Sequence, residues 1–183
     1  AKHCTQVTRH REGAEIIVFN GSGDVASARI TSIKRNVVAL ECLNVDHIEP
    51  PAVRITLAPA LIKADRWEWL LEKATELGVS EIQPVVTERC VVKLNADDAA
   101  RKHDKWQRLI IEGCKQSRRA WAPVLHPVRR LHDWCETNGA DGMHGLSLVA
   151  ALDETEISIK RAVEKSRAAT TARLIIGPEG DFT

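Results

Sequence analysis

Short runs of alternating apolar and polar residues fill the first part of the chain. Residues 15–19 form an apolar, β-branched run, followed at 20–23 by the tight-turn sequence Asn-Gly-Ser-Gly. The alternation continues over 26–31, and a further apolar run occupies 37–43. Several short strands separated by turn signals predict a small barrel or sandwich of β-strands.

A proline-containing segment follows these strands. Residues 46–51 read Asp-His-Ile-Glu-Pro-Pro, and two adjacent prolines block a helix and remove backbone donors from a sheet. We therefore expect a linker here, with a boundary near residue 50 that separates a domain at 1–49 from a domain at 50–183.

Strand and helix periods alternate in the second part of the chain. A strand is predicted at 53–57. The helix after it has an amphipathic stripe made of Trp67, Leu70, Leu71, Ala74 and Leu77. Asp65 and Glu68 resemble a capping box at its start, with Asp65 as the cap, and Gly78 is expected to end it.

The same alternation continues toward the end of the sequence. A strand at 79–86 precedes a long helix that opens at 97–98. Short strands are expected near 124 and at 145–150, then a helix at 155–169 and a strand at 173–176. Strands that alternate with helices predict an α/β domain with a largely parallel sheet.

Composition narrows the class of protein. Hydrophobic residues make up 44% and charged residues 28% of the 183 residues, as in ordinary globular domains. No apolar run approaches the roughly 18 residues of a membrane span, and the first residues contain no apolar leader. We expect a cytoplasmic protein without a membrane partner.

Cysteine and histidine spacing gives no sign of a metal site. The cysteines at 4, 42, 90, 114 and 135 are scattered singly, which favours reduced thiols over a disulfide framework. The seven histidines add no metal-ligand spacing. Cys90 and Cys114 lie among apolar residues, so we interpret them as core residues rather than nucleophiles.

Charge is segregated although the net charge is only +1. Nine Lys or Arg against two Asp or Glu between residues 101 and 130 give an excess of 9 − 2 = +7. A solvated helix face is the ordinary explanation of such a run. Few carboxylates occur at helical spacing here, which favours a surface for a polyanion.

Two further segments are candidates for ligand contact. An apolar strand runs into Gly177-Pro178-Glu179-Gly180, and ligands of open α/β sheets bind beyond the carboxyl ends of strands. The sequence matches neither the dinucleotide nor the P-loop fingerprint. Residues 116–119 (Gln-Ser-Arg-Arg) are either a cationic helix end or a polar cluster beside a phosphate.

Together these stretches resemble the bacterial small-subunit ribosomal RNA methyltransferase E family of the SPOUT, or trefoil-knot, superfamily. The two most specific stretches are 73–79 (Lys-Ala-Thr-Glu-Leu-Gly-Val) and 176–180 (Ile-Gly-Pro-Glu-Gly). Further matches occur in the family's order at His3, Val7, Arg9, Phe19, Asn20, Gly21, Lys63, Asp65, Arg66, Pro84, Glu88, Arg89, Lys93, Trp106, Gln116, Ser117, Arg119 and Pro123.

The resemblance implies a PUA-like β-barrel over 1–49, lacking its first strand, and an α/β trefoil-knot methyltransferase domain over 50–183 that forms a homodimer. It implies S-adenosyl-L-methionine as cofactor and N3 of a uridine in 16S rRNA as methyl acceptor. The implied cofactor loop is Ile176, Gly177, Pro178, Glu179 and Gly180. The implied RNA-facing residues are Arg9, Lys63, Arg66, Arg89, Lys93, Gln116 and Arg119, with Arg119 as the candidate catalytic residue.

The sequence departs from the family pattern at identifiable places. Where the family usually has the glycine of Gln-Ser-Gly-Arg, this chain has Arg118, and Asp181 stands where a second loop glycine often follows. The family continues with a segment of the type Leu-Gly-x-Arg-Ile-Leu-Arg-x-Glu-Thr-Ala, which threads the knot and completes the adenosine pocket. That segment is absent from these residues, so we expect an incomplete knot and a chain that is inactive alone.

The resemblance leads to a mechanism that relies mainly on positioning. Methyl transfer from a sulfonium requires alignment of sulfur, methyl group and nitrogen, and the uridine N3 must lose its proton. The residues identify no general base. The competing interpretations are a non-catalytic RNA-binding module and a small-molecule α/β enzyme that uses the Gly-Pro-Glu-Gly loop.

Overall fold

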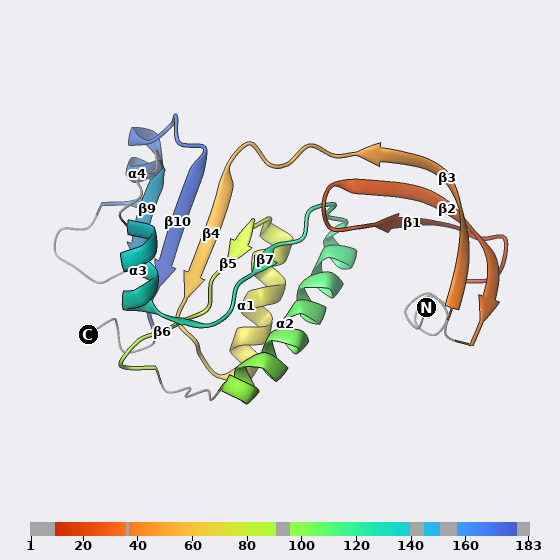
Figure 1. The fold of residues 1–183 in the computed structure, drawn as a ribbon. Coiled ribbons are helices and arrows are strands. Elements are labelled where there is room, and N and C mark those ends of the chain that lie inside the picture. The colour runs from red at the N-terminus through yellow and green to blue at the C-terminus, as the bar shows by residue number, and fades with distance from the viewer. Residues whose placement is uncertain (1–9, 36, 91–95, 140–144, 151–156, 179–183) are drawn as a thin grey trace. The chain divides into compact units, whose positions relative to one another are not determined.

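The computed structural model describes residues 10–35, 37–90, 96–139, 145–150 and 157–178. The chain divides into two compact units, Ala1–Pro50 and Pro51–Thr183 (Figure 1). The division falls between the two prolines of the linker segment. Among the described residues, no helix is long and apolar enough to cross a membrane.

The described part of the first unit is a three-stranded antiparallel sheet of β1 (Glu15–Phe19), β2 (Asp24–Lys34) and β3 (Val37–His47). The Asn20 side chain closes the β1–β2 turn, since its Oδ1 accepts hydrogen bonds from the backbone N–H of Ser22 at 2.7 Å and of Asp24 at 3.2 Å. The three predicted strands are present, but β2 and β3 are longer than expected. Asp24 pairs with His47 across the sheet, with 2.7 Å between Oδ1 and Nδ1, so the strand pair extends into the predicted linker.

The second unit is built on a parallel five-stranded sheet, as the alternating pattern predicted. Its order is β7 (Val124–Leu125), β5 (Glu81–Ile82), β4 (Arg54–Pro59), β10 (Thr171–Ile176) and β9 (Leu146–Ala150). The strand predicted at 79–86 is two strands, because Gln83 and Pro84 separate β5 from β6 (Val85–Val86). β6 forms a small second sheet with β8 (Arg129–Arg130).

Helices connect these strands: α1 (Ala64–Leu77), α2 (Ala96–Ser117), α3 (Leu131–Gly139) and α4 (Ile159–Lys165). The capping box predicted at Asp65 is wrong, because the helix begins two residues earlier, at Ala64, and Lys63 occupies the N-cap without a side-chain cap bond. Asp65 lies instead in the first turn, where a carboxylate favours the positive end of the helix dipole. The expected C-cap is confirmed, with Gly78 in the left-handed conformation at φ 87°. Helix α3 was not predicted.

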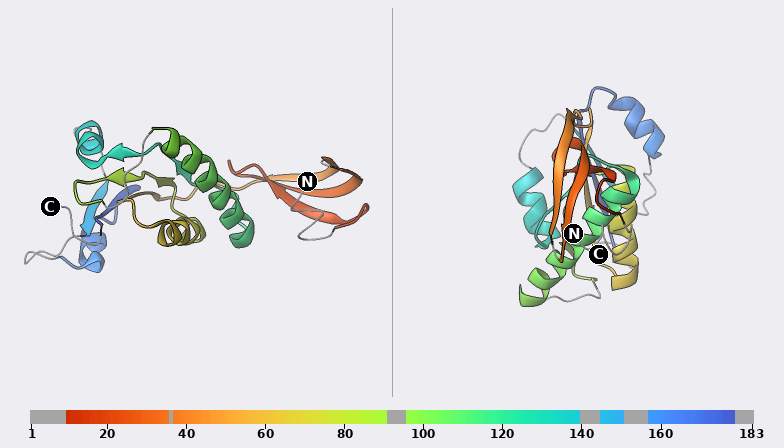
Figure 2. Two further views of the ribbon diagram at one scale, coloured as in Figure 1. Left: turned by 90° about the horizontal axis from the view of Figure 1, so that it is seen from below. Right: turned by 90° about the vertical axis from the view of Figure 1, so that its right-hand side faces the viewer.

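Helix α1 packs on one face of the sheet with α2 beside it, and α3 lies on the other face (Figure 2). The contact between α1 and α2 is tight. The rings of Trp67 and Trp106 lie 5.1 Å apart at 51°, and a Cβ on Gly113 would come within 3.2 Å of the Thr75 side chain. The cysteine interpretation is confirmed, since Cys90 and Cys114 are both buried. Burial raises the pKa of the Cys114 thiol, which keeps that thiol protonated.

The strand order contains a reversal. From β4 the chain proceeds outward to β5 and β7, then crosses to the far edge at β9 and returns to place β10 against β4. The first half of the sheet is built outward from β4 and the second half inward to β10, so the strand order reverses between them. Open α/β sheets bind ligands at the carboxyl ends of strands beside such a reversal, which is called a switch point. The switch point of this sheet lies between β4 and β10.

A non-glycine residue in the left-handed region ends α2. Arg118 has a φ of +55° and is the only non-glycine residue with positive φ in the described part of the chain. The next backbone N–H, from Arg119, donates to the Cys114 carbonyl at 3.0 Å. The family that the sequence resembles usually has glycine at this position, and glycine adopts this conformation without a steric penalty.

We predict that Arg118→Gly stabilises the protein. Relief of the left-handed strain, offset by the greater freedom of glycine in the unfolded chain, gives a gain of about 0.5–1 kcal/mol. Thermal unfolding should show a midpoint raised by about 2 °C. Arg118→Ala removes the same side chain but keeps the Cβ, so it should give no increase. Equal midpoints for the two variants would show that the backbone conformation is not the cause.

Candidate functional site

Three loops converge at the carboxyl edge of the sheet, beside the switch point. Ile176 pairs with Pro59, and the Ala60 N–H donates to the Ile176 carbonyl at 2.8 Å. The Leu61 N–H donates to the Val85 carbonyl at 2.9 Å. These bonds hold together the chain segments that leave β4, β6 and β10. Gly177 and Pro178, half-buried, therefore follow β10 directly beside the end of β4.

The floor beneath these loops is apolar. Ala58, Ala60, Val85, Cys90 and Trp134 form one buried cluster, against which Ile175 packs. Cys90 is held at the turn after β6, where its sulfur lies 3.3 Å from the Thr87 N–H that donates to it. An apolar floor under a glycine-containing loop suits a flat organic ligand whose backbone contacts come from the loop.

Several of the predicted RNA-facing residues belong to this carboxyl edge. Lys63 and Arg66 follow β4 at the start of α1, and Arg89 lies in the turn after β6. All three residues are exposed. The predicted residues Arg9, Lys93, Glu179 and Gly180 lie outside the described residues.

Arg119 and Gln116 lie at the other edge. Arg119 Nε donates to the Glu76 carbonyl at 2.9 Å, at the C-terminal end of α1. A Cβ on Gly78 would come within 2.3 Å of the Arg119 guanidinium, so only glycine leaves room for this contact. Because α1 and α2 run back from the carboxyl edge, their ends lie at the amino edge of the sheet. One chain therefore does not bring Arg119 together with Gly177 and Pro178.

The 73–79 segment has a structural explanation. The Lys73 ammonium contacts Glu72 and Glu76, each at 2.9 Å, and these bonds raise the pKa of Lys73. The buried Thr75 hydroxyl donates to the Leu71 carbonyl at 2.7 Å. The segment thus shapes the helix end that receives Arg119.

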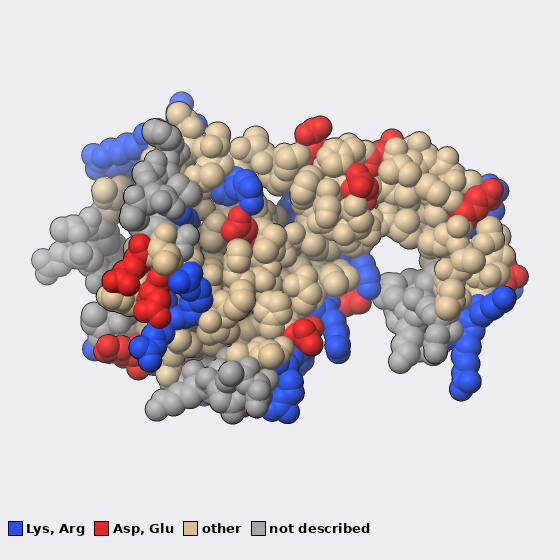
Figure 3. Space-filling model, viewed as in Figure 1, with Lys and Arg blue, Asp and Glu red and all other residues tan. Residues whose placement is uncertain are grey.

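The predicted polyanion surface on α2 is partly neutralised. Three of its cations form ion pairs: Arg101 with Asp98, Lys115 with Glu112, and Lys105 with Glu68 across to α1. The pair of Lys105 with Glu68 joins two helices, so the spacing of charges along the sequence did not predict it. On the visible face of the second unit, basic and acidic side chains are interspersed (Figure 3).

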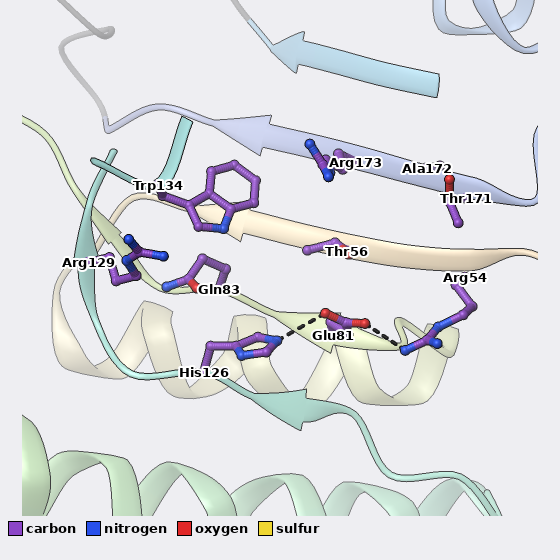
Figure 4. A pocket seen from close by; sticks show the side chains of 10 residues that line it. All are labelled: Arg54, Thr56, Glu81, Gln83, His126, Arg129, Trp134, Thr171, Ala172 and Arg173. Carbon is purple, nitrogen blue, oxygen red and sulfur yellow. Dashed lines mark hydrogen bonds and ion pairs between the residues drawn. The ribbon is translucent and has the colours of Figure 1, made fainter. Parts of the chain in front are cut away.

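A cavity of about 400 Å³ lies on the sheet face that carries α3 (Figure 4). Its polar lining comes from alternate positions of the central strands, Arg54 and Thr56 on β4 and Thr171 and Arg173 on β10. The other lining residues are Glu81, Gln83, His126, Arg129, Trp134 and Ala172. Of these residues, only Arg129 was predicted to contact a ligand, as one of the nine Lys or Arg between 101 and 130. Inner strands of a parallel sheet are normally apolar throughout. Arg54 on β4 and Arg173 on β10 break this pattern, and that departure was the sequence signal that could have indicated a polar site.

A small cluster of potential metal ligands lies on α3. One ligand atom each from His132, Asp133 and Glu136 lie within 4.8 Å of one another, and all three residues are exposed. Exposed groups of this kind are common without an ion. The expectation that no metal is used therefore stays a prediction.

Comparison with protein families gives two matches along the chain. A model described as an RNA methyltransferase PUA domain matches residues 1–41. A model described as an RNA methyltransferase domain matches residues 49–183. The order of the two models is that of the two structural units.

Curated relatives carry a common name. The ribosomal RNA small subunit methyltransferase E of Bacillus subtilis is 28% identical over 99% of this chain, which spans 72% of that relative. The relative of the same name from Synechocystis is 28% identical over 97% of this chain, which spans 56% of its length.

Solved structures agree with the fold. The ribosomal RNA small subunit methyltransferase E of Neisseria gonorrhoeae, bound to S-adenosyl methionine, superposes with a TM-score of 0.80 at 29% identity. The match covers 98% of this chain and 72% of that one. A Legionella pneumophila methyltransferase in complex with the same cofactor gives a TM-score of 0.83 at 28% identity, covering 100% and 72%. Since the RNA methyltransferase model covers well over half of the residues, the chain belongs to the RNA methyltransferase family represented by the small-subunit ribosomal RNA methyltransferases E.

Proposed function

We propose that this chain serves in the methylation of small-subunit ribosomal RNA, with S-adenosyl-L-methionine as methyl donor and N3 of a uridine in 16S rRNA as acceptor. The observation that carries the proposal is the position of Gly177 and Pro178, which leave β10 at the switch point beside β4. The solved relative from Neisseria is bound to this cofactor.

The residues at the carboxyl edge fit such a cofactor. The loop that begins at Gly177 offers backbone groups at the end of a strand, and the cluster around Ala60 and Cys90 offers an apolar surface below it. Ile176, Gly177 and Pro178 would hold the cofactor, together with Glu179 and Gly180. When bound, S-adenosylmethionine supplies a methyl group on a sulfonium, which makes alignment the main task of the protein.

The exposed cations at the same edge are placed to hold RNA. Lys63 and Arg66 lie at the start of α1, directly after the segment that leaves β4, and Arg89 lies in the turn after β6. Phosphate contacts by such side chains fix the position of an RNA without reading its sequence. A uridine whose N3 reacts must be unpaired, because that nitrogen takes part in base pairing. We expect the RNA-facing set to include Arg9, Lys93 and Gln116 as well.

The position of Arg119 supports a homodimer. If Arg119 takes part in the reaction, its place at the amino edge means that it must act at the carboxyl edge of a second copy. In a symmetric dimer the same pair of surfaces is used twice. Its bond to the Glu76 carbonyl would then hold the guanidinium in one orientation for the partner's site.

We predict that Gly177→Val lowers the affinity for S-adenosylmethionine at least tenfold, because a branched side chain would fill the space in which loop backbone meets ligand. Isothermal titration calorimetry measures the affinity. Ala168→Val, which adds similar bulk before the opposite end of β10, is the matched control and should bind normally. Normal binding by both variants would remove the loop from the cofactor site.

We predict that Arg89→Ala combined with Arg119→Ala weakens binding of small-subunit rRNA about tenfold or more and makes it less sensitive to salt. Filter binding at several salt concentrations measures this effect. Arg161→Ala combined with Arg167→Ala removes the same charge from other exposed positions of the second unit and should change binding less than twofold. Because Arg119 also holds α1, thermal unfolding of each variant is the folding control. Unchanged affinity would contradict the assignment.

We also predict that the 183 residues alone do not methylate small-subunit RNA. The cofactor-bound structural relatives contain residues with no counterpart in this chain, which covers 72% of each. Transfer of a labelled methyl group to small-subunit RNA is the measurement. Incorporation at N3 of a uridine would contradict the prediction and confirm the proposed activity, whereas RNA binding without transfer would agree with the prediction.

A further inference from the structure

We propose that the cavity on the sheet face binds a phosphate group of a single-stranded RNA segment, as a second anchor away from the cofactor edge. The inference rests on the proposed RNA substrate and extends it to residues that neither the sequence nor the comparisons assign. Its essential feature is the convergence of Arg129 and Arg173 on one hollow, with the hydroxyls of Thr56 and Thr171 (Figure 4).

The charge of the cavity favours an anion. Three arginines line it against one carboxylate, that of Glu81. Both Glu81 oxygens are engaged, since Oε1 accepts from Arg54 at 2.7 Å and Oε2 lies 3.0 Å from His126 Nε2. Glu81 is therefore compensated within its own network. With three arginines against one carboxylate, the set of lining residues has a net positive charge even when His126 is neutral.

The two remaining arginines are positioned by the fold. The Arg173 guanidinium lies 5.9 Å from the centre of the Trp134 ring, in a cation–π arrangement. Arg129 Nη2 donates to the Asp133 carbonyl at 3.4 Å, at the first turn of α3. Figure 4 shows Trp134 between the two side chains. A guanidinium placed against a ring presents its N–H groups sideways, in the fork geometry that suits phosphate oxygens.

The side chains that could recognise a base are not available in this cavity, which favours binding of a phosphate group. Trp134 is only 6% exposed, so its ring is a wall of the cavity and not a platform on which a base could stack. Both amide protons of Gln83 are directed to protein, because its Nε2 donates to the Pro84 and Pro127 carbonyls at 3.0 and 2.8 Å. The donors in this cavity are those of a sequence-independent phosphate contact.

The cavity is placed to act together with the proposed site. It lies on β4 and β10, the same two strands whose carboxyl ends form the switch point. An RNA strand that contacts Lys63 and Arg66 at the carboxyl edge would cross that edge to reach Arg173 on the face that carries α3. A second phosphate anchor there would fix the direction of the strand relative to the reacting base.

The test compares arginine variants of the 183-residue chain. Arg129→Gln combined with Arg173→Gln is assayed with a labelled single-stranded RNA of about 12 nucleotides, a length that spans such a site. We expect about tenfold weaker binding near 0.1 M salt. The slope of log K against log salt should fall by about 1.4, which corresponds to two lost contacts on a single strand.

Two controls accompany this variant. Arg161→Gln combined with Arg167→Gln removes the same charge elsewhere in the unit and should change affinity less than twofold. Arg129→Lys combined with Arg173→Lys keeps the charge and should retain the salt slope, although it loses the fork geometry. Thermal unfolding identifies any variant that fails to fold. If the glutamine variant fails to fold, the lysine variant is used in its place, and inorganic phosphate is added as a competitor for the bound RNA.

The outcomes separate this proposal from the proposed function. If the chain binds RNA and the glutamine pair behaves like the Arg161 and Arg167 control, the cavity proposal is wrong and the proposed function stands. If the chain binds S-adenosylmethionine but no RNA, both the cavity proposal and the RNA substrate are wrong. Inorganic phosphate is expected to displace RNA from the lysine variant at a lower concentration than from the unchanged chain. If both proteins lose RNA at the same phosphate concentration, the arginine fork has no role in binding.

Discussion

The pairing of β10 with β4 is the constraint on which the second unit depends. Six residue pairs, from Thr171 with Arg54 to Ile176 with Pro59, join segments that are more than a hundred residues apart in sequence. This pairing closes the sheet between its two halves and creates the switch point. It also places both the candidate cofactor loop and the lining of the sheet-face cavity on the same two strands. Loss of register here would disturb both sites at once.

The two edges of the sheet carry different chemistry. The carboxyl edge joins a glycine-containing loop, an apolar floor and the cations that follow β4 and β6. The amino edge holds Arg119 against the end of α1, where Gly78 leaves room for the guanidinium. Arg119 and the loop that begins at Gly177, which the family resemblance assigns to one functional site, are thus separated by the length of a strand within one chain. A reaction that uses both sets needs two copies of the sheet.

The elements with strong local signals could be predicted from the sequence. The amphipathic stripe and Gly78 defined α1, and the alternation of strands and helices defined the parallel sheet. Helix α3 was missed because its sequence, from Leu131 to Gly139, carries little apolar periodicity and is stabilised by Trp134 in the buried cluster. Asp65 was wrongly assigned as the cap because Asp is a common N-cap residue and the sequence alone does not show which residue begins the helix. The cavity could not be predicted, because only the register of β4 and β10 brings Arg54, Thr171 and Arg173 to one face.

The distant pairing of β10 also has a consequence for biosynthesis. A ribosome releases β4 long before Thr171–Ile176 emerges, so one edge of this central strand stays unpaired until β10 has been made. Contacts between distant segments slow folding, and unpaired edges expose a chain to aggregation. The helices α1 and α2, which pack locally through Trp67 and Trp106, can form first and shield one face of the growing sheet. The pairing of β10 with β4 is therefore the late step that joins the two halves of the described sheet.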